Sequence, residues 1–221
     1  MALRHKDNQS IRINENETNY HDYVIKDGLF IGEFERMYED CDDPWHQTEL
    51  KWHKLSFSRN IAILNMKRLN IESIIEFGCG FGFFTNMIKE SMINVKGVDI
   101  SPRAISKAEN LFPKIDFSVN TIQNMLETQK EVCMKYDAFL LSEITWYILS
   151  DIDMIIKNLK EFSGKYLIND LIFYKGKQKY GTEYFTTLDE FIDFIPFDCI
   201  ARSESTSKNE GGIETCTVFK I

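Results

Sequence analysis

The sequence predicts an α/β fold, in which a doubly wound, mostly parallel sheet of seven strands ends in an antiparallel hairpin. From residue 73 onwards, short β-branched and apolar runs alternate with amphipathic helical patterns. A glycine-rich turn follows the first of these runs, and the last two runs are joined directly by the polar segment 207–212. Since strands that alternate with helices pair in parallel, we expect helices on both faces of the sheet and right-handed crossovers.

Composition limits the class of protein. The 221 residues are enough for one substantial core, and we expect residues 1–70 to form an arm and helical cap and residues 71–221 to form the α/β domain. Five cysteines lack a C-x-x-C pair, and the chain has no secretory pattern and no membrane-length apolar run. These features favour a reducing cytoplasm, with no zinc site, no disulfide framework and no membrane contact. The formal charge of −8 argues against nucleic acid and favours a small substrate. A monomer and a homodimer are both compatible.

The first seventy residues carry weaker patterns. Residues 1–20 are polar, and we expect a loose arm. Helical spacing of apolar residues predicts one helix over 29–38 and another over 47–69. The segment between them contains Pro44 and Trp45, which predicts a turn whose tryptophan is buried or lies against a ligand.

The remaining elements follow from periodicity and turn signals. Strands are expected at 73–77, 94–100, 115–120, 136–142, 165–171, 198–206 and 213–220, and helices at 82–91, 102–111, 121–131, 151–162 and 187–194.

The turn after the first strand has the chemistry of a ligand cradle. Gly78, Gly80 and Gly82 let the backbone turn sharply and let a ligand lie against it. The free N–H groups at the start of the next helix are expected to face polar ligand atoms. The spacing is G-x-G-x-G, with Phe83 where a nicotinamide fingerprint has its third glycine. Glu76, two residues before the first glycine, would repel a pyrophosphate and attract an ammonium group.

This motif resembles the first motif of the class I, seven-strand, Rossmann-like methyltransferases that use S-adenosylmethionine. In that resemblance, Asp99 at the end of the second strand binds the ribose hydroxyls, and Asn120 after the third strand accepts from the adenine amino group, where the family usually has Asp. Each of these two residues is equally suited to capping the helix that follows. The implied cofactor residues are Glu76, Gly78, Cys79, Gly80, Gly82, Asp99, Ile100, Asn120, Thr121 and Ser142.

The end of the fourth strand is where the methyl group is expected. Ser142 and Glu143 would lie beside the methionine portion of the cofactor, with Trp146 and Tyr147 as walls of the acceptor pocket. A solvated Glu143 and a Trp146 that only packs against the core are the alternatives.

Two short segments, 42–45 and 141–147, resemble a narrower group that includes the rhizobial nodulation N-methyltransferase and related sugar or small-molecule methyltransferases. This resemblance implies an acceptor that is a sugar, a nucleotide sugar or a related metabolite. The aromatic and lysine-rich stretch 174–184 is either a gripping loop for such a substrate or a solvated loop. The expected acceptor-binding residues are Trp45, His46, Trp146, Tyr147 and Tyr174.

Methyl transfer from a sulfonium needs alignment and the exclusion of water, and it needs no metal or covalent enzyme intermediate. A hydroxyl or amine acceptor also needs a group that takes its proton, for which His53 and Glu143 are the candidates, with His46 as a further one. The expected activity is therefore O- or N-methylation of a small polar acceptor. Methylation of protein or RNA and a catalytically silent regulatory subunit are the alternatives.

Overall fold

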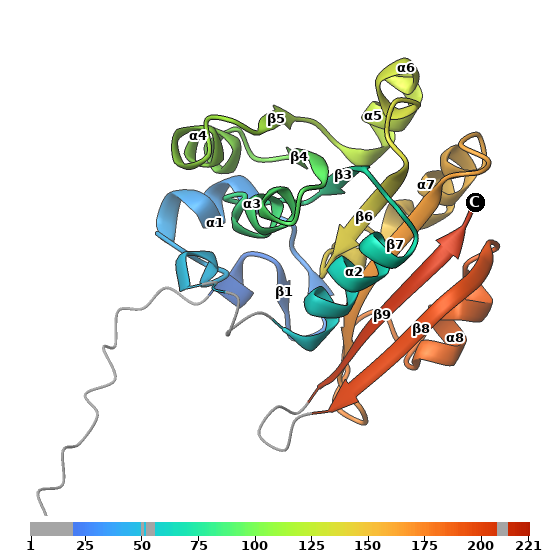
Figure 1. Cartoon of the computed structure of the whole chain (residues 1–221). Helices are drawn as coiled ribbons and strands as arrows, with labels where there is room; N and C mark the ends of the chain where they lie inside the picture. The colour runs from blue at the N-terminus through green and yellow to red at the C-terminus, as the bar shows by residue number, and fades with distance from the viewer. Residues whose placement is uncertain (1–19, 50, 52–55, 207–211) are drawn as a thin grey trace, which may run out of the picture.

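A computed structural model describes residues 20–49, 51, 56–206 and 212–221. Its main feature is a seven-stranded sheet in the order β5-β4-β3-β6-β7-β9-β8 (Figure 1). The strands are β3 (Ser73–Phe77), β4 (Asn94–Asp99), β5 (Asp116–Val119), β6 (Ala138–Ser142), β7 (Tyr166–Phe173), β8 (Asp198–Thr206) and β9 (Ile213–Lys220).

The pairing confirms the predicted fold class. β3 pairs in parallel with β4 and β6, and parallel pairing continues outward to β5 and β7. β9 lies antiparallel between β7 and β8, which forms the predicted terminal hairpin. Because the strand order reverses at β3, the carboxyl ends of β3, β4 and β6 border a crevice of the kind that binds ligands in such sheets.

Helices cover both faces of the sheet because neighbouring strand residues point to opposite sides. Ile74 packs with α2 and α3, whereas Ile75 packs with α5, α7 and α8. α4 packs against Phe117 of β5. The helices of the sheet region are α2 (Phe57–Arg68), α3 (Phe83–Glu90), α4 (Pro102–Leu111), α5 (Ile122–Thr128), α6 (Lys130–Cys133), α7 (Ile152–Leu159) and α8 (Leu188–Phe194).

The structure corrects the helix predicted over 29–38. A short hairpin of β1 (Ile25–Lys26) and β2 (Leu29–Phe30) precedes α1 (Phe34–Asp40). Asp27 and Gly28 form its two-residue turn, with φ of 53° and 81°. Positive φ at both central positions is the geometry that an Asp-Gly pair favours in tight hairpins, so this dipeptide was the missed signal.

The helix predicted over 47–69 is also corrected. The described residues form a 3₁₀ turn, Gln47–Glu49, and then α2, which begins where the Ser56 side chain accepts from Arg59 N over 3.3 Å. Asp43 holds the 3₁₀ turn, because its carboxylate accepts from the backbone N–H groups of Gln47 and Thr48, each over 2.8 Å. The predicted arm, as far as residue 19, and the candidate base His53 lie outside the described residues.

Polar contacts fix the segment 20–49, here called the cap, against α4. Arg103 donates to Glu39 over 3.1 Å, and Lys107 donates to the backbone carbonyl of Asp42 over 2.7 Å. Ser101 also donates to Glu35. The cap therefore lies beside the carboxyl end of β4.

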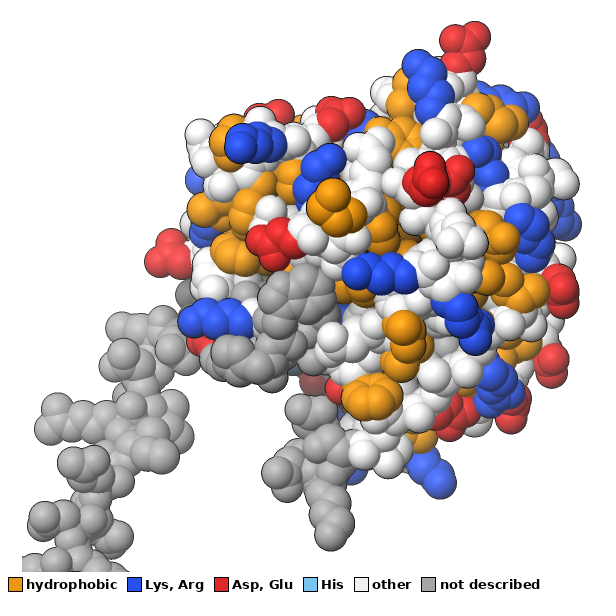
Figure 2. Space-filling view, in the orientation of Figure 1, with side chains coloured by type: hydrophobic (Ala, Val, Ile, Leu, Met, Phe, Trp, Pro, Cys, Tyr) orange, Lys and Arg blue, Asp and Glu red, His pale blue; other side chains and the backbone are white. Residues whose placement is uncertain are grey.

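Surface charges of both signs are mixed on the face seen in Figure 2, where Lys and Arg side chains lie among Asp and Glu side chains. The described side chains form no continuous basic surface on this face. Within the described part of the chain, no helix is long and apolar enough to cross a membrane.

Candidate active site

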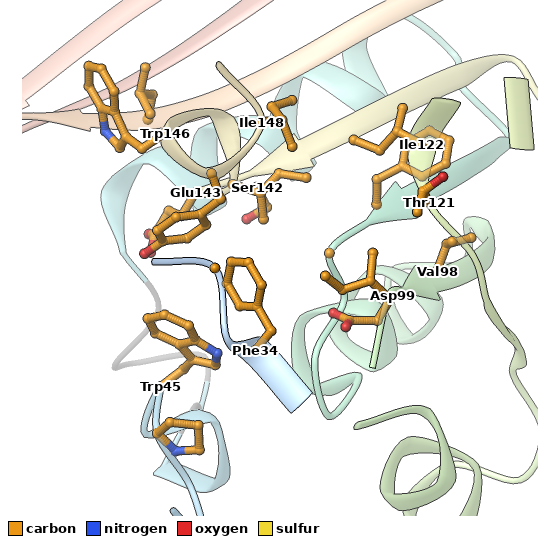
Figure 3. A pocket seen from close by; sticks show the side chains of 18 of the residues that line it. Phe34, Trp45, Val98, Asp99, Thr121, Ile122, Ser142, Glu143, Trp146 and Ile148 are labelled. Atoms are coloured by element: carbon orange, nitrogen blue, oxygen red, sulfur yellow. The ribbon is translucent and has the colours of Figure 1, made fainter. Parts of the chain in front are cut away.

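A cavity of about 490 Å³ lies between the carboxyl ends of the central strands and the cap. This volume is in the range of small-molecule sites, about 300–1,000 Å³. In Figure 3, Asp99, Thr121 and Ile122 lie toward one end, and Glu143, Trp146 and Trp45 lie toward the other. The predicted residues that line the cavity are Gly78, Asp99, Ile100, Asn120, Thr121, Ser142, Glu143, Trp45, His46, Trp146, Tyr147 and Tyr174.

Four predicted cofactor residues do not line the cavity: Glu76, Cys79, Gly80 and Gly82. Cys79 is 1% exposed and packs against α4 and Phe117. Gly82 begins α3 with a φ of 77°, and a Cβ on it would lie 2.6 Å from Phe117. These residues shape the turn and hold it against its neighbours.

Gly78 lines the cavity at a position that has no room for a side chain. Its φ is 71°, and an added Cβ would lie 2.4 Å from Cγ2 of Ile144. Only glycine adopts this conformation without strain and without that clash. The bare backbone that the glycine motif predicts for a closely approaching ligand is thus present at Gly78.

The N–H groups of the turn itself bond within the protein, whereas the expected ligand contact of the N–H groups at the start of α3, from Phe83 onward, remains a prediction. The Gly78 and Cys79 N–H groups donate to Val98 O over 2.7 and 3.1 Å, and Gly82 N donates to Cys79 O over 3.0 Å. Gly80 N donates to Asp99 Oδ2 over 2.9 Å, and Phe81 N donates to Gln47 Oε1 over 2.7 Å. Every N–H from residue 78 to residue 82 therefore has an acceptor within the protein.

Glu76 is buried beneath the turn. It is 2% exposed, and its Oε2 accepts from the Thr85 hydroxyl over 2.6 Å. Burial raises the pKa of Glu76 to about 7, against the opposing effects of Thr85 and Arg59. Its predicted contact with a ligand ammonium remains a prediction.

Asp99 marks one end of the cavity and is 7% exposed. Besides the Gly80 N–H, it accepts from Ser101 N over 2.9 Å. Burial raises the pKa of Asp99, while these backbone donors lower it. Each carboxylate oxygen can accept a second hydrogen bond, so Asp99 retains the capacity to accept hydrogen bonds from ribose hydroxyls, as predicted.

Asn120 lines the same end of the cavity, but its carbonyl oxygen is already engaged. Oδ1 accepts from Thr121 N over 3.0 Å and from Asn124 Nδ2 over 2.7 Å. Thr121 itself caps α5 by accepting from Asn124 N over 3.1 Å. Since a carbonyl has two lone pairs, the predicted acceptance from an adenine amino group would require one of these bonds to shift.

Aromatic rings form the other end of the cavity. Ring centroids are 4.7 Å apart for Tyr20 and Trp45, 5.8 Å for Trp45 and Tyr147, and 5.4 Å for Phe34 and Tyr147. Burial raises the pKa of Tyr20, Tyr147 and Tyr174, and the charge of Glu143 adds to each shift. Glu143 and these rings line the same cavity, an arrangement suited to a cationic ligand group.

Glu143 is held in an unusual conformation at this end. Its φ is 58°, which is uncommon for a residue other than glycine, and its N–H donates to Asp170 O over 2.9 Å. Arg59 Nη2 lies 3.5 Å from Glu143 Oε2, and Arg59 Nε donates to Ser142 Oγ over 3.1 Å. His46, another lining residue, has a φ of 51°. Such backbone outliers cluster at functional sites.

Behind Glu143, Asp170 completes a buried charge cluster. Its side chain is 0% exposed, lies 3.9 Å from Arg59 Nε and accepts from Ser142 Oγ over 3.1 Å. Oδ1 has no hydrogen-bond partner among the described residues. Burial raises the pKa of Asp170.

Sequence reasoning missed Arg59, Asp170, Gln47 and Tyr20. Asp170 stands one residue before the end of the predicted fifth strand, 165–171, and that position was an available signal. Arg59, Gln47 and Tyr20 belong to segments without a motif, and no local signal marks them. Within the described ranges, no group of three or more His, Cys, Asp or Glu side chains could hold a metal ion.

The sheet order, the glycine turn and the cavity over the strand ends define a class I methyltransferase that uses S-adenosylmethionine. The residues present fit this cofactor, because the cavity combines the bare backbone of Gly78 with the carboxylate of Asp99. A family model described as Nodulation protein S (NodS) matches residues 33–177, and the chain belongs to this family.

Solved structures with the same fold are distant in sequence. The N-methyltransferase NodS from Bradyrhizobium japonicum WM9, in complex with S-adenosyl-L-homocysteine, has 16% identity and a TM-score of 0.60, covering 81% of this chain and 92% of that chain. The methyltransferase domain of bacterial CtHen1-C has 16% identity and a TM-score of 0.58, covering 74% and 96%. An S-adenosylmethionine-dependent methyltransferase from Clostridium acetobutylicum ATCC 824 has 14% identity and a TM-score of 0.57, covering 86% and 98%. A search of curated protein sequences found no significant match.

Proposed function

We propose that this chain methylates an amine of a small polar acceptor, with amino sugars as the first class to test. The observation that carries this proposal is the acceptor end of the cavity, which Glu143 lines together with the aromatic side chains of Tyr20, Trp45 and Tyr147. Rings and a carboxylate together attract a protonated amine. The structurally similar Bradyrhizobium protein is named an N-methyltransferase, which agrees with this choice. A sugar or nucleotide-sugar hydroxyl is the competing acceptor.

The residues have distinct proposed roles. S-adenosylmethionine supplies the methyl group as an electrophile on its sulfonium sulfur. Asp99 and Gly78 hold the adenosyl side against the sheet, and Trp45, Tyr147 and Tyr174 enclose the acceptor and exclude water. Glu143 takes the proton that an ammonium acceptor must lose before its lone pair can attack. Its side chain is 32% exposed, so it can reach a bound acceptor. His53 remains a second candidate base.

Two measurements test this function. Calorimetry with S-adenosylhomocysteine on the wild type, Asp99→Ala and Glu76→Ala tests the cofactor residues, and unchanged affinity in both variants would refute them. Release of S-adenosylhomocysteine from the cofactor, measured with a panel of amino sugars, simple amines and nucleotide sugars, tests the acceptor. Turnover only with hydroxyl acceptors would reject the amine. Turnover with none of the panel would favour a protein or RNA acceptor or a silent cofactor-binding subunit.

A further inference from the structure

Aromatic side chains form a connected wall, here called the aromatic wall, at the acceptor end of the cavity. Its members line the cavity and are partly exposed: Tyr20, Phe34, Trp45 and Tyr147. Trp45 contacts Tyr20 and Tyr147, with ring centroids 4.7 and 5.8 Å apart, and Tyr147 contacts Phe34 at 5.4 Å. Phe34 and Trp45 belong to the cap, whereas Tyr147 follows β6. A ligand group that enters this end therefore meets rings from both parts of the protein.

The tryptophans that line the cavity have no free N–H to direct at a ligand. Trp45 Nε1 donates to the Tyr38 hydroxyl over 3.0 Å, and Trp146 Nε1 donates to Ile172 O over 3.0 Å. An indole N–H is a donor only, and a free one pointing into the cavity would oppose a cation. Because both are paired within the protein, these side chains offer the ligand carbon surface.

Glu143 adds one carboxylate at this end. Burial raises the pKa of Tyr20, Tyr147 and Tyr174, and the charge of this carboxylate raises each pKa further, so it lies within electrostatic range of all three side chains. Arg59 Nη2 lies 3.5 Å from Glu143 Oε2. Among the described residues, Oε1 has no hydrogen-bond partner and is able to accept an N–H from a ligand.

The substitution of an ammonium group decides how well it suits such surroundings. A primary ammonium carries three N–H donors, and each methyl group replaces one of them with apolar surface. A donor that finds no acceptor in a closed pocket costs free energy. Aromatic rings, in contrast, attract methylated ammonium groups, which are the ligands of aromatic cages. Several rings beside one carboxylate thus match a cation that carries methyl groups and few N–H groups.

We propose that this chain methylates the same nitrogen more than once, and that an N-methylated amine is its preferred acceptor. In each round Glu143 takes a proton from the ammonium, and the freed lone pair forms the new C–N bond. The electron pair of the broken C–S bond stays on sulfur, so each round consumes one S-adenosylmethionine and yields S-adenosylhomocysteine. The methylated product of one round is the acceptor of the next. This proposal rests on the amine assignment of the proposed function and adds the substitution state of the nitrogen.

The first test measures binding along one series of ligands. Calorimetry on protein saturated with S-adenosylhomocysteine gives the Kd of ethanolamine, its N-methyl and N,N-dimethyl derivatives, and choline. The uncharged alcohol in which carbon replaces the nitrogen of choline separates charge from size. Affinity is expected to rise along the series, and choline should bind about 2- to 30-fold more tightly than the uncharged alcohol, the range of a cation–π interaction. Equal affinities along the series, or equal binding of the uncharged alcohol, would overturn the proposal.

Variants of Trp45 test the aromatic wall. Trp45→Leu is expected to remove most of the preference for choline over ethanolamine, and Trp45→Phe should lie in between, because Phe binds cations less well than Trp. The Kd of S-adenosylhomocysteine should change by less than about 2-fold in both, which also verifies folding. Phe112→Leu is the matched control, since Phe112 packs against Phe83 at 5.3 Å outside the cavity. An unchanged choline preference in Trp45→Leu, or equal weakening of S-adenosylhomocysteine, would overturn the proposal.

The second test identifies the product. Mass spectrometry follows the amine that the acceptor panel shows to react fastest, and its N-methyl derivative, with the cofactor in excess. Dimethylated product is expected, and the N-methyl derivative should have a KM about 2- to 10-fold below that of the primary amine. A product that stays monomethylated would overturn this proposal and leave the amine assignment intact. Turnover with hydroxyl acceptors alone, or with no acceptor, would refute both.

Discussion

Gln47 Oε1 accepts a hydrogen bond from the backbone N–H of Phe81 over 2.7 Å, and this bond joins the cap to the glycine turn. The contact satisfies the N–H of Phe81, which lies just before the N-cap of α3. A Cβ on Gly80 would lie 2.6 Å from Gln47 Nε2, so the Gln47 side chain would have to shift to admit it. The cap and the turn thus form one packed unit.

Replacing Gln47 by Leu is expected to lower the free energy of unfolding by about 1–3 kcal/mol, because the partly buried Phe81 N–H loses its acceptor. Urea unfolding at constant pH measures the difference. Gln47→Glu, which retains an acceptor oxygen, should lose much less. Equal losses in the two variants would show that side-chain packing, and not the hydrogen bond, matters at this position.

Gly78→Ala is expected to abolish tight binding of S-adenosylhomocysteine and to destabilise the fold. The positive φ costs about 1–2 kcal/mol for a residue with a Cβ, and the clash with Ile144 at 2.4 Å adds an overpacking cost. Gly164→Ala is the matched control, since Gly164 has a φ of 87° but no atom within 4 Å of an added Cβ. Calorimetry and urea unfolding of both variants separate the clash from the backbone strain. Similar results for the two would refute the role of the clash.

The stability of the protein should depend on pH through Glu76. Burial raises its pKa from 4.5 to about 7, so the folded state holds a proton that the unfolded state has released in this window. The stabilisation is complete below pH 4.5 and is lost as the pH rises to 7. Relative to Glu76→Gln, the wild type should lose about 3 kcal/mol of unfolding free energy across the window.

Urea unfolding at several pH values between 4.5 and 8 would measure this loss. Glu131→Gln, an exposed acid on α6, should show no such trend. A difference between the wild type and Glu76→Gln that stays constant or grows with pH would contradict the prediction.

Glu143→Gln is expected to reduce kcat about 100- to 10,000-fold for an amine acceptor, because the variant cannot take the acceptor's proton. The Kd of S-adenosylhomocysteine should change by less than about 3-fold, since the proposed role concerns the acceptor. Asp153→Asn, an exposed acid on α7, should leave both quantities unchanged. Rate profiles against pH complete the test. If Glu143→Gln kept the wild-type rate, Glu143 would not be the base, and His53 would be the next residue to substitute.

The sequence by itself determined the seven strands, their parallel and antiparallel parts, the glycine turn and the class of cofactor. These features depend on local spacing, since alternation, glycine positions and strand-end acids are all read within a few neighbouring residues. The tertiary structure alone decided which groups meet. Phe81 and Gln47 are 34 positions apart, and Arg59 and Ser142 are 83 apart, so no local spacing encodes either contact.

The two ends of the cavity differ in the same way. The predicted cofactor residues lie at strand ends, and parallel pairing brings these ends to one edge of the sheet, whatever the lengths of the helices between them. The acceptor side is assembled from Tyr20, Trp45 and Tyr147, on segments that meet only when the cap packs over the sheet. The pairing of the turn's N–H groups and the exposure of Arg59 to the cavity likewise follow from packing, because burial and hydrogen-bond partners are properties of the folded chain.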